Sequence, residues 1–140
     1  MKKIIVIIIM FTTVFGFSQK KELRNAEKRL NEGFYNEALD ILSQIEGVII
    51  SSEQKYQAHY YYLLGWANKG DTNYDAAVPL LRKAIDLDNF DKYTEDAGIL
   101  IDQIEIELVN SAVQDNKNED FISASKRLYD AYLISHLYLD

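Results

Sequence analysis

Apolar residues after position 19 recur at the three- and four-residue spacing of helices that bury one face. No stretch shows the sustained alternation of apolar and polar residues that is typical of a β-strand. Clusters of Gly, Asn, Asp and Ser interrupt the pattern at residues 31–33, 47–52, 69–73, 88–89 and 115–118. They leave six expected helices, at residues 20–31, 35–46, 53–69, 74–87, 93–115 and 118–138. The pattern predicts an all-α protein of about three helix–turn–helix pairs, at approximately 20–46, 53–87 and 93–138.

The second helix of each expected pair carries one repeated set of residues. An aromatic residue is followed by Ala three positions later, Leu four further on, and a small or aliphatic residue three after that. The sets are Tyr35, Ala38, Leu42 and Ile45; Tyr74, Ala77, Leu81 and Ala84; and Phe121, Ala124, Leu128 and Ala131. Each first helix has a small residue 12 positions before that Ala, namely Ala26, Gly65 and Ala112. Steps of three and four place each set on one stripe, and small residues on both helices allow a close crossing.

This pattern resembles the tetratricopeptide repeat, a helix–turn–helix unit of 34 residues. The second copy matches best, at Tyr61, Leu64, Gly65, Tyr74, Ala77, Leu81 and Ala84, and the first copy also keeps Gly33 in its turn. The chain departs from the family at Thr72, where Gly is usual, and at Asn89, where Pro is usual. Its Ala-to-Ala spacings are 39 and 47 residues. The resemblance implies a short right-handed α-solenoid that binds a protein or peptide through its concave face and has no catalytic activity of its own.

Residues 1–18 have the features of a secretory signal peptide. Two lysines precede a 12-residue apolar run, residues 4–15, and the small residues Gly16 and Ser18 suit cleavage after Ser18. A membrane-spanning helix needs about 20 apolar residues, so the short run favours a cleaved signal over a retained anchor. We therefore expect a repeat domain over residues 19–140. We also expect it to be exported to the periplasm or the cell exterior, with no stable membrane insertion after cleavage.

Composition excludes several classes of function. The chain has 15 basic and 22 acidic residues, and loss of the two leader lysines would leave 13 against 22, a net charge of −9. Such an acidic surface repels phosphate backbones, so we expect no nucleic-acid partner. The absence of Cys excludes disulfides, thiolate zinc sites and a cysteine nucleophile.

No combination of residues indicates an enzyme, and we expect no catalytic residue, metal or cofactor. His59 and His136 are the only histidines, and they do not have the spacing of metal ligands. The segment 71–75 begins like a calcium loop, but Ala76 and Arg82 occupy the sixth and twelfth places, where Gly and Glu are required. This segment is better interpreted as the entry to a helix.

The candidate binding residues are His59, Tyr62 and Trp66, which share one face of the expected helix 53–69, and Lys69, which continues that face. In tetratricopeptide repeats this face usually lines the concave groove that receives peptides, and aromatic anchors suit such a groove. The third copy offers Ile106, Val109 and Val113 at the equivalent places. The aromatic stripe suits packing between neighbouring helices equally well, because such stripes are commonly core. Both interpretations remain open at this point.

Two functions of other classes are also consistent with the sequence. Residues 134–140 are still apolar, and Leu137 and Leu139 have no evident cap. This would suit the extracytoplasmic sensor portion of a larger or truncated signalling protein, as in bacterial regulators where such repeats precede a membrane span. Alternatively, Trp66 and the tyrosines would serve as stacking platforms in a helical protein that binds a glycan or small molecule.

Overall fold

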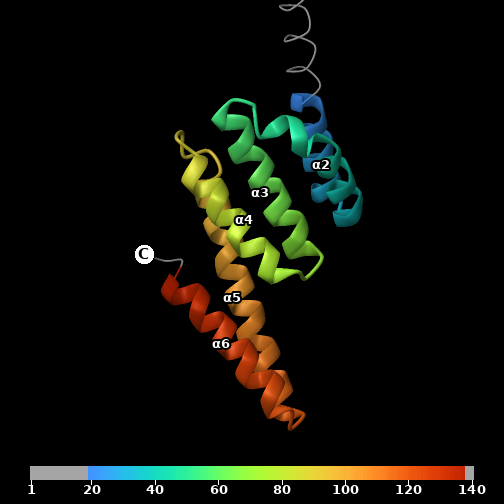
Figure 1. The fold of residues 1–140 in the computed structure, drawn as a ribbon. Coiled ribbons are helices and arrows are strands. Elements are labelled where there is room, and N and C mark those ends of the chain that lie inside the picture. Colours follow the sequence, from blue (N-terminus) through green and yellow to red (C-terminus); the bar gives the residue numbers. More distant parts are fainter. Residues whose placement is uncertain (1–18, 138–140) are drawn as a thin grey trace, which may run out of the picture.

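The computed structural model describes residues 19–137, and all regular structure within that range is helical (Figure 1). A first helix over residues 19–31 is followed by α2 (Tyr35–Ile49), α3 (Gln54–Gly70), α4 (Tyr74–Leu87), α5 (Thr94–Lys117) and α6 (Phe121–Leu137). The prediction of an all-α fold is confirmed, and the described helix ends differ from the expected ones by at most three residues. The expected signal peptide and Leu139 lie outside the described residues.

The helices are arranged as consecutive hairpins, as in a helical-repeat protein. Helix α3 packs most extensively on α4, and α5 packs most extensively on α6. Smaller contacts of α2 with α3 and of α4 with α5 join one pair to the next (Figure 1). None of the helices in residues 19–137 combines the length and the apolar character that crossing a bilayer requires.

The turns inside the three pairs are structural copies of one another. In each, the residue two places before the aromatic has a positive φ: 80° at Gly33, 60° at Thr72 and 63° at Glu119. The N–H of the following residue donates to the carbonyl five residues earlier, over 2.9 Å in all three turns. The donor and acceptor residues are Phe34 and Arg29, Asn73 and Asn68, and Asp120 and Asp115. This is the Schellman motif that ends helices, and here it forms with Gly in only one of the three turns.

The small residues of the repeat lie at the helix crossings. Ala26, Ala38 and Ala77 are fully buried, and the third-pair residues Ala112 and Ala124 are buried as well. At Gly65, an added Cβ atom would lie only 2.6 Å from the Leu81 Cγ atom. The backbones of α3 and α4 therefore approach too closely at this point for any larger residue.

The third pair is displaced along the array relative to the first two. The ring of Tyr35 packs against Gly70, the last residue of α3. The equivalent Tyr74 instead contacts α5 at Glu107, ten residues before the end of that helix. Ten residues of α-helix span about 15 Å. The turn of the third pair consequently projects beyond the other two pairs (Figure 1).

Two residues that the repeat pattern placed in the packed interior lie instead at the surface. Phe121 is 63% exposed and Leu128 is 50% exposed, whereas the equivalent Leu42 and Leu81 are both 0% exposed. In the first two pairs, the first helix of the next pair contacts the second helix of the pair before it. Within the described residues no helix follows α6, so Phe121 has no next helix of the kind that Tyr35 and Tyr74 contact.

Candidate functional site

His59, Tyr62 and Trp66 lie on one face of α3, and Tyr93 covers His59 and Tyr62. Tyr93, which precedes α5, stacks on His59 at 4.8 Å and on Tyr62 at 5.3 Å between ring centroids. Tyr62 also contacts Trp66 at 5.9 Å. Only 8% of Tyr62 is exposed, and Trp66 is half-buried. This arrangement favours the packing interpretation for His59 and Tyr62, because little of their surface is open to a ligand.

Lys69, the fourth candidate groove residue, joins the second and third pairs. Its Nζ atom lies 2.8 Å from Oε1 of Glu107, and the Tyr74 hydroxyl donates to Oε2 of the same carboxylate at 2.6 Å. Burial raises the pKa of Glu107, but the hydrogen bonds from Lys69 and Tyr74 outweigh it and hold that pKa below its ordinary value. Burial, and then the bond to Glu107, raises the pKa of Tyr74 to about 12. Lys69 is therefore engaged within the protein.

His59 is a partly buried histidine whose Nε2 atom is fully buried and unsatisfied. Its Nε2 atom has no hydrogen-bond partner among the described residues, and the nearest carboxylate oxygen, Oε2 of Glu27, is 3.5 Å away. Burial, and secondly the charge of Lys92, lowers the pKa of His59 to about 4. The half-exposed Glu27 is screened by solvent and does not reverse this effect. The ring is consequently neutral at pH 7.

A cleft of about 400 Å³ opens beside His59, between the first helix, α3 and the loop before α5. Its walls carry basic side chains and aromatic rings, namely Lys20, Arg24, Lys55, Lys92, Tyr56, Phe90 and Tyr93. Of its two carboxylates, Asp88 accepts hydrogen bonds from the backbone of Tyr93 and Thr94, and Glu27 is the one near His59. Lys55 is paired with Glu53 at 2.7 Å. The lining of this cleft therefore contains more basic than acidic side chains, although the chain as a whole is acidic.

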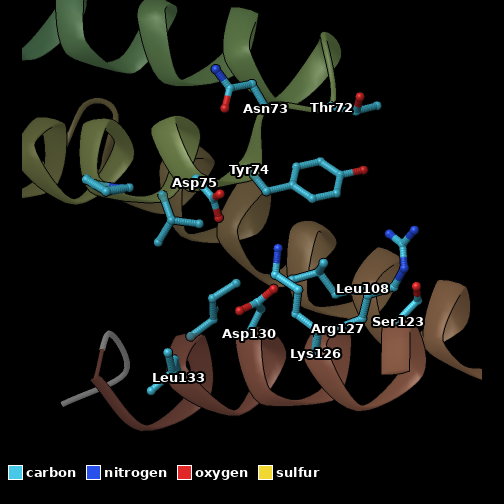
Figure 2. Close-up of a pocket in the computed structure, with 13 residues that line it drawn as sticks. Thr72, Asn73, Tyr74, Asp75, Leu108, Ser123, Lys126, Arg127, Asp130 and Leu133 are labelled. Atoms are coloured by element: carbon cyan, nitrogen blue, oxygen red, sulfur yellow. The ribbon is translucent and has the colours of Figure 1, made fainter. Parts of the chain in front are cut away.

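A second cleft, of about 470 Å³, lies between α4 and α6, and Leu108 of α5 also lines it (Figure 2). Val78, Pro79 and Leu108 contribute apolar surface, and Figure 2 shows Lys126 and Asp130 reaching from α6 toward α4. The cleft contains groups of both charges and has no hydrogen-bonding constellation of a catalytic kind. It is large enough to accept a side chain of another polypeptide.

A group of exposed apolar and aromatic residues lies on α6. Its residues, here named the α6 face, are Phe121, Ile122, Leu128, Tyr129 and Tyr132, all at least half exposed. Helical spacing places Phe121, Leu128 and Tyr132 on one stripe and Ile122 and Tyr129 on the adjacent one. Large exposed apolar patches are typical of interaction sites, and aromatic residues dominate the energetics of such interfaces. The repeat pattern did not reveal this surface, because it assigned Phe121 and Leu128 to the interior.

Within residues 19–137 no three His, Asp or Glu side chains are grouped so that they could hold a metal ion. No protein-family model matches the chain, and neither curated proteins nor solved structures include a match to it.

Proposed function

We propose that the chain is an exported, non-catalytic scaffold of the tetratricopeptide-repeat type that binds another protein, and that the α6 face is the surface that binds it. The observation that carries this proposal is the contrast between equivalent leucines. Leu42 and Leu81 are 0% exposed, and Leu128 is 50% exposed. Among the described residues, the third pair presents the same kinds of side chain as the first two pairs but leaves its leucine half exposed.

The mode of binding follows from the packing of the first two pairs. There, Tyr35 packs on α3 and Tyr74 contacts α5, so each aromatic residue meets the first helix of the next pair. A helix of the partner that lies against the α6 face would bury Phe121, Leu128 and Tyr132 in the same manner. Full burial of one large apolar side chain contributes about 1.5–3 kcal/mol, so two or three such anchors support specific binding.

Binding through the concave face at His59, Tyr62, Trp66 and Lys69 has less support. Tyr62 is covered by Tyr93, and Lys69 is paired with Glu107. A ligand at these residues would have to displace contacts that hold the second and third pairs together.

Site-specific photo-crosslinking in the cells that produce the protein tests the proposal. A benzophenone amino acid at Tyr129, on the α6 face, is expected to give a discrete adduct with one other protein. The same group at Ile50 is the matched control, because Ile50 is 62% exposed but lies in the turn after α2. Adding Leu128→Asp to the variant that carries the benzophenone amino acid at position 129 should abolish the adduct. Absence of an adduct from Tyr129, or an equal adduct from Ile50, would contradict the proposal.

A further inference from the structure

A second apolar line runs along the outer side of α5. Ile99, Ile106 and Val113 are each about half exposed and are spaced by seven residues. Glu95 in the first turn and Lys117 in the last turn continue the line, and both are exposed. At 3.6 residues per turn, these five side chains fall within about 40° of one another around the helix. They lie opposite the buried side of α5, formed by Ala97, Ile101, Ile104, Leu108 and Ala112.

The line is symmetric about its centre. Ile106 lies seven residues from both Ile99 and Val113, and eleven residues from both Glu95 and Lys117. An antiparallel copy of the same helix, centred on Ile106, would therefore place Ile106 against Ile106 and Ile99 against Val113. A two-fold interface uses one patch twice and must be self-complementary in this way.

We propose that the outer side of α5 is a homodimer interface in which two copies of the chain pair their α5 helices antiparallel about Ile106. This goes beyond the binding function proposed for the α6 face and uses a different surface. The seven-residue spacing keeps these β-branched residues on one stripe along which a second helix can pack.

The positions of the charged residues support a second copy of the chain as the occupant. In the centred antiparallel register, Glu95 of one copy lies opposite Lys117 of the other, and this pair occurs twice. Asp102 lies opposite Asn110, and Gln103 lies opposite Val109, so no like charges face each other along the seam. The antiparallel arrangement also places the N-terminus of each helix beside the C-terminus of its partner, which the helix dipoles favour.

The test uses the fact that the chain has no Cys. In the full chain under mild oxidation, Ile106→Cys alone should form a disulfide-linked dimer on a non-reducing gel. Ile99→Cys alone should remain monomeric, since its two copies would be about 21 Å apart along the seam. The double variant Ile99→Cys/Val113→Cys should crosslink again.

Each other outcome overturns the proposal. If Ile99→Cys crosslinked as efficiently as Ile106→Cys, the two α5 helices would be parallel or would meet in no fixed register. If Ile122→Cys, on the α6 face, formed a dimer and Ile106→Cys did not, the chain would associate with itself through the α6 face and not through α5. Sedimentation equilibrium gives a second readout: Lys117→Glu should raise the dimer dissociation constant about tenfold, and Glu95→Lys/Lys117→Glu should restore it. These results would not change the adduct expected from position 129, so the dimer proposal can be wrong while the proposed function is right, and the reverse.

Discussion

At the scale of single residues, Gly65 determines how closely α3 and α4 approach. A Cβ atom there would meet the Leu81 Cγ atom at 2.6 Å and the Leu81 backbone nitrogen at 3.1 Å. The Cγ atom is a branch point near the backbone, so it cannot swing away as the end of a long side chain would. Gly98, which also lies inside a helix, has nothing within 4 Å of the same hypothetical atom.

Alanine substitution at these two glycines should therefore have opposite effects. Gly65→Ala should lower the free energy of unfolding by about 1–3 kcal/mol, because the crossing becomes overpacked. Gly98→Ala should raise it by about 0.5–1 kcal/mol, because Ala is the better helix former and meets no obstacle. Urea denaturation measures both. A Gly65→Ala variant as stable as Gly98→Ala would show that the crossing is looser than described.

His59 should make stability depend on pH below neutrality. Its pKa falls from 6.5 to about 4 on folding, so between those values the unfolded chain binds the proton more tightly. The contribution of neutral His59 to the free energy of unfolding is fully present above pH 6.5. It is lost as the pH falls toward 4, by about 3 kcal/mol in total.

The control variant is His59→Phe, which keeps an aromatic ring against Tyr93 and does not titrate. Denaturation at pH 7 and pH 4.5 should show a larger loss for the parent than for the variant. Parallel losses would mean that the His59 ring is protonated inside the folded protein.

At the scale of helices and turns, most of the fold could be predicted from local chemistry. Clusters of Gly, Asn and Asp mark the helix ends, and the three- and four-residue periodicity identifies what lies between them. Two features could not be predicted in this way. Thr72 and Glu119 adopt the left-handed backbone conformation that the pattern associates with Gly, because the Schellman hydrogen bonds and the packed helices on either side hold them there.

The second unpredicted feature is the position of the third pair. The spacing of 47 residues, against 39, indicates that a loop or a first helix is longer. It does not show that the extra residues move the whole pair along the array, which follows from the contact of Tyr74 with Glu107. That contact joins residues 33 positions apart, beyond the reach of periodicity.

The candidate site was harder to predict than the fold, for the same reason. The spacing of His59, Tyr62 and Trp66 correctly places them on one face of α3. Whether that face is open depends on Tyr93, which comes from the loop before α5. In the same way, the repeat pattern identifies Leu128 as equivalent to Leu81, but it does not reveal that Leu81 is fully buried and Leu128 half exposed.

At the scale of the whole molecule, the described residues form three consecutive helix pairs, and the turn of the third pair projects beyond the other two (Figure 1). Among the described residues nothing covers the α6 face or the outer side of α5, which are two different surfaces. We interpret the first as the site for another protein and the second as the site for another copy of the chain. Both interpretations depend on the third pair being uncovered in the free protein.

The most direct measurement compares the three equivalent leucines in the free chain. Leu42→Ala and Leu81→Ala should each lower the free energy of unfolding by about 2–5 kcal/mol, because each leaves a cavity in the core. Leu128→Ala should lower it by less than about 1 kcal/mol, because half of that side chain is already in water. Equal losses at all three positions would show that the α6 face is packed in the free protein, and would contradict its role as a binding surface.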